Sequence, residues 1–498
     1  MLAKLIAKLG PVASLGAGML SRASSQIVAL LITLIAARYL TPGDFGVYAI
    51  AAALVTIIRT LIYSATFQYV MQTPDLKRYS SECLAVSLVM TAICSALPVL
   101  ILLVFPNLFG GGGVLWLFVW MAPSNLIAAF TAWSEAQVLR SGKIARYYAV
   151  TSVTEFLSGG VAAILFVAGF GVMSLVPMAY VRAIVLAGCY VWILRPVLSS
   201  AFSASRFVEV GRWSLPQYAS SLTGLFSNYG ADFIIGAILS PAATGLYRAA
   251  SRITGAVSDL CAQPVRLIAT TVFARRRAAG GHASDLWPAV AALSLFIALP
   301  ALGGLAAVAD LILPRLFGPA WANLAAIVAV LSLGRVFASM AGVATPFLVA
   351  HGQHRILLPV QLVSAACLLI GLVVFSRQGV QATAIVTAVS VSVGALAYLG
   401  MAYRTAGSPP AASARLMLVA AIPGLVSTFA AGALSRTTLV PDPILLAIIA
   451  VAVAVGLWLV AVLVLRRGLT PILHPLRADA ASVSTPEADV TVLEVKAR

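Results

Sequence analysis

The sequence predicts an all-α membrane protein with about fourteen transmembrane helices. First, 61% of its 498 residues are hydrophobic, only 9% are charged, and the mean hydropathy is +1.03. Second, apolar runs of about 20 residues, the length that crosses a bilayer, recur from one end of the chain to the other. Third, the runs lack the period-two alternation of a membrane β-barrel. This composition excludes a chain of soluble domains.

The apolar runs set the order of the predicted elements. In residues 1–20, Lys4 and Lys8 lie on a different helical face from the apolar residues, which predicts a short interfacial helix and no cleavable signal. The predicted spans are 21–40, 45–70, 82–105, 114–139, 148–169, 172–194, 212–238, 244–273, 286–309, 320–349, 356–375, 380–403, 416–434 and 443–465. The polar, proline-containing tail, residues 466–498, is expected to be disordered.

The distribution of basic residues predicts the orientation of these spans. If the N-terminus and every second connection are cytoplasmic, 21 of the 32 Lys and Arg residues lie in the cytoplasm, and 4 lie outside. The remaining 7 lie within spans. This asymmetry follows the positive-inside rule and predicts that both termini are cytoplasmic. The net charge of +17 therefore reflects membrane orientation, and nucleic acid is not an expected partner.

A short motif occurs twice and indicates an internal repeat. Residues 40–48 and 239–247 share the pattern Leu-[Ser/Thr]-Pro-x-x-x-Gly-[Val/Leu]-Tyr, after the first and the seventh span. Each repeat then has six spans, and an even number makes both copies run in the same direction. The prediction is an N-terminal lobe at 21–200 and a second lobe at 201–403. A pseudo-twofold axis along the membrane normal relates them, and a further helix pair follows at 404–465.

The stretch Ala36-Ala37-Arg38-Tyr39-Leu40-Thr41-Pro42-Gly43-Asp44-Phe45-Gly46-Val47-Tyr48-Ala49 resembles a signature of polysaccharide-synthesis transporters. These are the Wzx-type lipid-linked oligosaccharide flippases of the multidrug/oligosaccharidyl-lipid/polysaccharide exporter superfamily. Asp232 and the second motif resemble the start of that family's second lobe. The resemblance covers residues of about 20 to 403. It implies two lobes facing each other across a cavity, alternating access, and a polyprenyl-pyrophosphate-linked glycan as cargo.

Charged residues inside the predicted spans mark the candidate site. A charge at mid-bilayer costs roughly 2.5–3.5 kcal/mol on insertion scales, so such residues are rare and usually line a pathway. The cations are Arg59, Arg182, Arg248, Arg252, Arg266 and Arg335, and the acids are Glu135, Glu155, Asp232 and Asp259. Helical spacing places most of them on polar stripes, which predicts a water-filled cavity with a positive bias.

We assign substrate binding to the six arginines and ion coupling to the four acids. The planar guanidinium binds phosphate oxygens in pairs and stays charged at physiological pH. Each role competes with a simpler one, since buried acids and arginines also form structural ion pairs, and Arg248 and Arg266 near helix ends can extend to the interface. The coupling ion, a proton or Na⁺, is open, and so are the sugars, the oligomeric state and the lateral portal for the lipid.

The sequence lacks the residue patterns of a disulfide framework, a metal site and a nucleotide-binding loop. The five cysteines lie in predicted helices, so no disulfide framework is expected. The four histidines have no Cys or acid at metal-ligand spacing, so no metal and no cofactor are expected. The run from Gly110 to Gly113 lacks the Gly-Lys-[Ser/Thr] that a nucleotide loop needs.

The predicted function is translocation of a polyprenyl-pyrophosphate-linked oligosaccharide across a bacterial inner membrane, for export of O-antigen, exopolysaccharide or capsule. The protein is predicted not to be an enzyme. Its expected partners are the glycan lipid, membrane lipids, and the polysaccharide polymerase and export machinery. The alternatives are a peptidoglycan-precursor flippase, a multidrug exporter, a membrane glycan polymerase or ligase, and a scaffold. Short outer connections argue against the polymerase or ligase, and charges within several spans argue against the scaffold.

Overall fold

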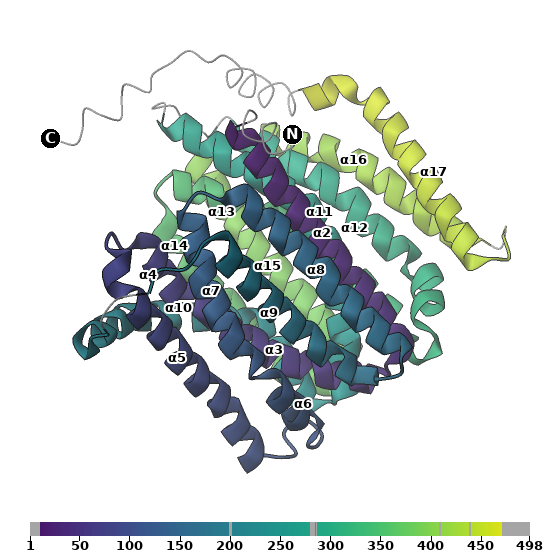
Figure 1. Cartoon of the computed structure of the whole chain (residues 1–498). Helices are drawn as coiled ribbons and strands as arrows, with labels where there is room; N and C mark the ends of the chain where they lie inside the picture. The colour runs from purple at the N-terminus through teal and green to yellow at the C-terminus, as the bar shows by residue number, and fades with distance from the viewer. Residues whose placement is uncertain are drawn as a thin grey trace, which may run out of the picture. The chain divides into compact units, whose positions relative to one another are not determined.

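A computed structural model describes residues 10–198, 202–278, 284, 286–407, 410–437 and 440–470. All regular secondary structure in this part of the chain is helical, which confirms the predicted all-α class (Figure 1). The first repeat contains α2 Gly10–Tyr39, α3 Pro42–Ser64, α4 Thr66–Gln72, α5 Leu76–Val104, α6 Gly113–Met121, α7 Ser124–Arg140, α8 Ile144–Val167, η1 Gly171–Ser174 and α9 Leu175–Ile193.

The second repeat and the last helix pair follow in the same manner. They comprise α10 Ala204–Ile238, α11 Pro241–Ala278, α12 Trp287–Phe317, η3 Pro319–Trp321, α13 Leu324–Ala350, α14 His354–Phe375, η4 Ser376–Gln378, α15 Val380–Ala406, α16 Pro410–Ser435 and α17 Pro443–Val464. Every predicted span overlaps one of these helices. The first part of the tail predicted at 466–498 is not disordered, since residues 466–470 are helical. The rest of that tail, from residue 471 onward, and residues 1–9 of the predicted interfacial helix lie outside the described residues.

Eleven helical segments of the described chain are long and apolar enough to cross a membrane. α2 and α10 contain the shorter apolar stretches Ser24–Tyr39 and Tyr229–Ile238. α11 does not qualify, because charged residues recur along it and lower its mean hydropathy. The chain is therefore a multi-pass membrane protein, and the number fourteen stays a prediction.

Three predicted elements differ from the structure in how the helices are divided, and not only in where they end. α2 runs without a break from Gly10 into the first span, so residues 10–20 are not a separate helix. The second predicted span is divided at Ala65, whose φ of −120° and ψ of −83° lie outside the helical region. The fourth is divided between α6 and α7, because Pro123 has no N–H to continue the helical hydrogen bonding.

The helices group into two compact units by their contacts. Unit 1 comprises residues 1–260, 309–334 and 361–391, and unit 2 comprises 261–308, 335–360 and 392–498. The predicted boundary between the lobes, at residues 200 and 201, falls inside unit 1. The predicted division into two lobes that move as bodies thus stays a prediction.

In unit 1, α2 and α8 lie side by side along much of their length (Figure 1). Gly159 permits this close packing, since a Cβ there would lie 2.8 Å from Val28. The Ser152 hydroxyl also donates to Ser21 at 2.9 Å. Small residues and interhelical hydrogen bonds are the usual way in which membrane helices associate, because lipid supplies no hydrophobic drive between them.

The two copies of the repeated motif begin α3 and α11 in the same manner. Thr41 caps α3 by accepting from the Asp44 N–H at 3.2 Å, and Ser240 accepts from the Ala243 N–H at the same distance. A proline follows each capping residue, a position where its missing N–H costs nothing. The shared sequence pattern is therefore a shared helix start.

The two motifs also touch each other. A Cβ added at Gly46 would overlap the carbonyl oxygen of Pro241, and one added at Gly245 would overlap that of Pro42. Each glycine also lies against the other's backbone nitrogen. The contact is reciprocal, as a twofold axis between the repeats requires. We call it the glycine crossing.

Connections on the predicted outer side contact one another. Arg38, in the last turn of α2, donates to the Arg315 carbonyl at 3.5 Å. The indole N–H of buried Trp321 donates to the Ala37 carbonyl at 3.2 Å. Both contacts join connections that the charge distribution assigns to the same side, so the alternation of the predicted topology holds at this end of unit 1.

Connections on the predicted cytoplasmic side also contact one another. Lys143 donates to the Ile193 carbonyl at 2.9 Å, which joins the connection before α8 to the end of α9. Arg140 donates to the Pro74 carbonyl at 3.1 Å, which joins the end of α7 to the start of α5. These pairs place the second, fourth and sixth predicted connections at one end of unit 1.

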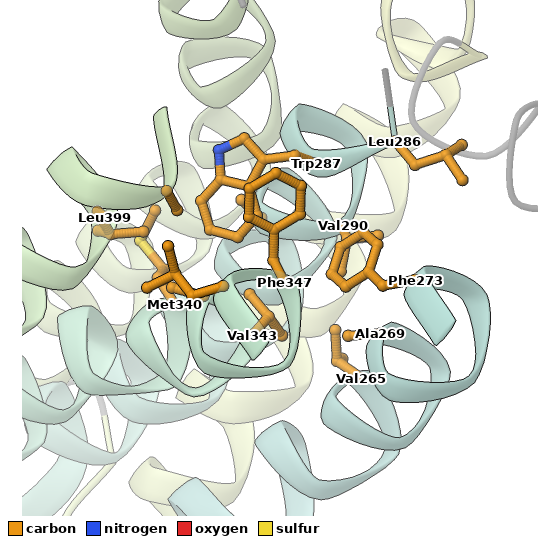
Figure 2. Close-up of a cluster of buried hydrophobic side chains, with 14 residues drawn as sticks. Val265, Ala269, Phe273, Leu286, Trp287, Val290, Met340, Val343, Phe347 and Leu399 are labelled. Atoms are coloured by element: carbon orange, nitrogen blue, oxygen red, sulfur yellow. The ribbon is translucent and has the colours of Figure 1, made fainter. Parts of the chain in front are cut away.

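Unit 2 has its own core. Figure 2 shows Trp287 with Phe347, whose ring centroids are 5.0 Å apart, and Phe273 lies 5.2 Å from Phe347. Val265, Val290, Met340, Val343 and Leu399 complete much of this cluster. It joins the ends of α11, α12, α13 and α15.

Small residues attach α16 to α12 in unit 2. A Cβ at Gly303 would overlap the Thr428 side chain, and one at Gly424 would lie 2.9 Å from the Leu299 side chain. These positions recur at intervals of four residues on each helix, which allows close backbone approach. α17 then packs along α16, and the two are antiparallel neighbours in Figure 1.

Candidate functional site

In the first repeat, Arg59 of α3 is held by neutral groups of α7. Its Nε donates to Asn125 Oδ1 at 3.1 Å, and its Nη2 donates to Ser124 Oγ at 2.9 Å. The residue is half-buried. Neither partner carries a charge, so these bonds orient the guanidinium without neutralising it.

Glu135 of α7 is also held by neutral donors. The hydroxyl of Tyr63, one turn beyond Arg59 on α3, donates to Glu135 Oε2 at 2.7 Å. Tyr147 of α8 interacts with the same carboxylate. Glu135 is 6% exposed, so the tyrosines supply the hydrogen bonds that water would otherwise provide.

Glu155 of α8 forms a direct ion pair with Arg182 of α9, with 2.5 Å between Oε1 and Nη2. The Glu155 side chain is 8% exposed, and that of Arg182 is 42% exposed. Arg182 also interacts electrostatically with Arg59 and Glu135. The structure therefore brings four predicted site residues of the first repeat into one group, which we call the N-terminal cluster: Arg59, Glu135, Glu155 and Arg182.

In the second repeat, Asp232 of α10 pairs with Arg248 of α11. Arg248 Nη1 lies 3.0 Å from Asp232 Oδ2, and the guanidinium lies over the ring of Tyr229, 5.1 Å from its centroid. The Asp232 side chain is 1% exposed, and its second oxygen, Oδ1, has no hydrogen-bond partner in the described part of the chain. Arg252 also interacts electrostatically with Asp232.

Two residues of the α11 stripe reach α2 of the first repeat. Arg252 Nη1 lies 3.5 Å from Thr33 Oγ1, the long limit of a hydrogen bond. Gln26 Nε2 donates to Asp259 Oδ2 at 3.2 Å. We call Asp232, Arg248, Arg252 and Asp259 the second cluster. Its contacts with α2 join polar side chains of the two repeats. The water-filled cavity that the stripes predict stays a prediction.

The last two candidates belong to unit 2. Arg266, farther along α11, is exposed, and Arg335 of α13 is half-buried. Neither is part of the two clusters of unit 1. Their role in substrate binding stays a prediction from sequence alone.

The arginines thus differ in how their charge is balanced. Arg182 and Arg248 each contact a carboxylate directly. Arg59 and Arg252 have only neutral hydrogen-bond partners among the described residues. Because an unpaired guanidinium keeps its attraction for anions, Arg59 and Arg252 are the strongest candidates for phosphate binding.

Sequence reasoning missed one buried ion pair. Glu82 of α5 is fully buried, and its Oε1 accepts from Arg206 Nη2 at 2.8 Å and from the Ser203 N–H at 2.9 Å. The pair anchors the start of α10 against α5. An acid at the very start of a predicted span was the available signal, but its partner lies 124 residues away.

The comparisons with known proteins agree with this architecture. The family model described as "Polysaccharide biosynthesis protein" matches residues 35–326, which include both motifs and all eight residues of the two clusters.

The chain belongs to the polysaccharide biosynthesis protein family.

A curated protein of similar sequence is the succinoglycan biosynthesis transport protein ExoT of Rhizobium meliloti (strain 1021), 24% identical over 206 residues. The alignment covers 41% of this chain and 42% of the length of that relative.

Solved structures show how this family member folds. The lipid II flippase MurJ in an inward closed conformation matches with a TM-score of 0.74 at 14% identity, over 90% of this chain and 98% of that one. An inward-facing multidrug resistance transporter of the MATE family, of the MOP superfamily, matches with a TM-score of 0.61 at 13% identity, over 77% and 94%. The chain therefore has the fold of exporter-superfamily transporters, as the motif predicted.

Proposed function

We propose that this protein is a flippase that moves a polyprenyl-pyrophosphate-linked oligosaccharide across a bacterial inner membrane for polysaccharide export. The observation that carries the proposal is the presence of Arg59 and Arg252 inside a polysaccharide biosynthesis family fold, each with only uncharged hydrogen-bond partners among the described residues. Such guanidiniums can bind pyrophosphate oxygens without first giving up a carboxylate. The ExoT similarity supports a transport role in polysaccharide synthesis.

The proposed mechanism is alternating access of the two repeats around the arginines. With the cytoplasmic side open, Arg59 and Arg252 bind the pyrophosphate. Release outward requires that this attraction weaken, because a ligand shifts a two-state equilibrium only by its differential affinity for the states. An ion arriving at an acid near the arginines can change the field in the cavity and supply this difference.

The four candidate acids are not equally suited to ion coupling. Glu155 and Asp232 are engaged by arginines. Glu135 accepts a hydrogen bond from Tyr63, and Asp259 accepts one from Gln26. Each carboxylate can therefore bind and release a cation without breaking an ion pair. We therefore propose Glu135 and Asp259 as the coupling residues, with a proton or Na⁺ as the ion.

The charge balance also separates the alternatives. A multidrug exporter for cationic drugs is expected to have an acid-rich cavity, whereas the two clusters contain as many arginines as acids, and two of the acids are paired with arginine. A peptidoglycan-precursor flippase would use the same arginine chemistry, and the match to MurJ at 14% identity concerns the fold alone. The two flippase functions therefore differ only in the glycan.

Vesicles that contain the purified protein test this proposal. Three cargoes are compared: a polyprenyl-pyrophosphate-linked oligosaccharide, a lipid-linked peptidoglycan precursor, and a cationic dye. We expect translocation of the oligosaccharide lipid well above protein-free vesicles, and no transport of the dye. Preference for the peptidoglycan precursor would favour the second flippase function, and transport of the dye alone would overturn the proposal.

A further inference from the structure

Six helices of unit 2, α11 to α16, have ends that pack together in one place. The hydrophobic cluster of Figure 2 contains residues from the last turns of α11, α13 and α15 and from the first turns of α12. Leu357 of α14 and Met417 of α16 pack against it. A neighbouring cluster joins Ala292 and Ala420 to Leu469, just after α17. Segments far apart in sequence are thereby held together at this end.

Exposed arginines flank these clustered residues. Arg404 follows buried Ala402 by two positions, and Arg415 directly precedes Leu416. Exposed arginines also lie within four residues of the clustered residues Phe273, Leu357 and Leu469. Together these exposed residues form a group of seven that we call the arginine end: Arg275, Arg277, Arg355, Arg404, Arg415, Arg466 and Arg467.

The positive charge at this end is not balanced within the described part of unit 2. The one carboxylate there, Asp442, caps the start of α17, at the opposite end of that helix from Arg466. No salt bridge joins an arginine of this group to a carboxylate among the described residues. In unit 1, by contrast, Arg206 pairs with Glu82, and Lys143 donates to a backbone carbonyl.

The identity of the residues is as informative as their number. Lys and Arg orient a membrane protein equally well, so orientation alone does not require one of them. The described part of unit 2 contains arginine and no lysine. Arginine presents a planar fork that binds two phosphate oxygens, whereas lysine acts as a point charge.

We infer that the arginine end is a binding surface for the phosphate headgroups of anionic lipids in the leaflet on its side of the membrane. The arginines lie where membrane-spanning helices end, which is the level of the headgroups, and basic clusters beside such ends recognise anionic lipid. This position assigns the surface to a lipid rather than to free phosphate. The inference is independent of the cargo and of the arginines of unit 1.

The test measures lipid selectivity at the protein surface. Wild-type protein is reconstituted in phosphatidylcholine vesicles with a trace of spin-labelled phosphatidylglycerol or spin-labelled phosphatidylcholine, and the immobilised fraction of each label is recorded. The wild type should immobilise phosphatidylglycerol preferentially. The selectivity is the ratio of immobilised phosphatidylglycerol to immobilised phosphatidylcholine. In the double variant Arg404→Gln/Arg415→Gln, this ratio should fall by roughly fivefold for each arginine removed, until neither lipid is preferred.

The matched control is Arg377→Gln/Arg436→Gln, which removes two exposed arginines from the predicted outer side. It should keep wild-type selectivity. Arg404→Lys/Arg415→Lys should recover only part of the loss, because the charge returns without the fork. Excess inorganic phosphate should leave the immobilised lipid in place.

Three results would overturn the inference. They are unchanged selectivity in the arginine-end variant, an equal loss in the control variant, and release of the labelled lipid by inorganic phosphate. All four substituted arginines are exposed, so the variants should fold normally. Melting temperatures in detergent that equal that of the wild type would verify this. Because lipid selectivity is measured without any cargo, its failure leaves the proposed transport function untouched.

Discussion

Asp232 and Arg248 show what a buried ion pair does at the scale of single residues. The carboxylate is almost fully buried, and Arg248 forms a salt bridge with it at 3.0 Å. Removing one partner of such a pair leaves an uncompensated buried charge, which costs about 3–5 kcal/mol. We therefore expect Asp232→Ala to lower the melting temperature of the detergent-solubilised protein strongly.

The comparison for this prediction is Asp442→Ala. Asp442 is exposed and caps α17 through the Ile444 N–H at 2.9 Å, so its loss should cost only about 1 kcal/mol. If both variants melt alike, Asp232 and Arg248 do not form the stabilising pair that the structure describes.

Glu135 and Glu155 allow a test of ion coupling at the same scale. Glu135→Gln keeps a hydrogen-bond acceptor for Tyr63 and removes a charge that forms no salt bridge among the described residues. We expect the variant to fold normally and to transport cargo with little dependence on a proton or Na⁺ gradient. Glu155→Gln should instead lower stability, because Arg182 loses its carboxylate. Wild-type gradient dependence in a folded Glu135→Gln protein would exclude Glu135 from coupling.

At the scale of elements, the glycine crossing predicts how the outer side opens. Gly46 and Gly245 let α3 and α11 start in backbone contact. Alanine at either position must push the two helices apart. Overpacking of this kind costs about 1–2 kcal/mol in the crossed state, which is a shift of about 5–30-fold toward states in which the repeats are separated.

The shift can be followed with a single cysteine at position 50, in a background that lacks the native cysteines. Ile50 is fully buried on α3, one turn beyond Gly46. Gly46→Ala or Gly245→Ala should speed its reaction with a membrane-impermeant thiol reagent added from outside. Gly43→Ala should not, since its Cβ would meet only the Thr41 hydroxyl at 3.6 Å. Equal rates in all variants would show that the crossing does not close the outer side.

At the scale of the whole molecule, the charge distribution predicts an orientation. Reporter fusions after residues 280 and 470 should both be cytoplasmic, because 21 of the 32 basic residues then lie on that side. The contacts of Arg38 with Arg315 and of Lys143 with Ile193 fix which connections share an end of unit 1 but not which end is cytoplasmic. A periplasmic signal at either fusion point would reverse the topology.

The sequence alone could predict the helices and the repeat, because hydropathy and the repeated Pro–Gly motif are local signals. It also predicted that Arg59 and Arg252 lie in a polar environment. It could not predict that Arg59 would find Ser124 and Asn125 while Arg182 would find Glu155, since helical periodicity orders one helix and not its neighbours. For the same reason, the sequence could not predict the Glu82–Arg206 ion pair or the break at Ala65.

The measurement that most directly tests the account is translocation of a polyprenyl-pyrophosphate-linked oligosaccharide by Arg59→Ala/Arg252→Ala protein in vesicles. The account predicts loss of most translocation, because each charge-assisted bond to phosphate contributes roughly 1.5–3 kcal/mol. It also predicts partial recovery in Arg59→Lys/Arg252→Lys and wild-type rates in the outer-side control Arg377→Ala/Arg436→Ala. Full translocation by the double alanine variant would contradict the anion-binding mechanism and, with it, the proposal of a phosphate-bearing cargo.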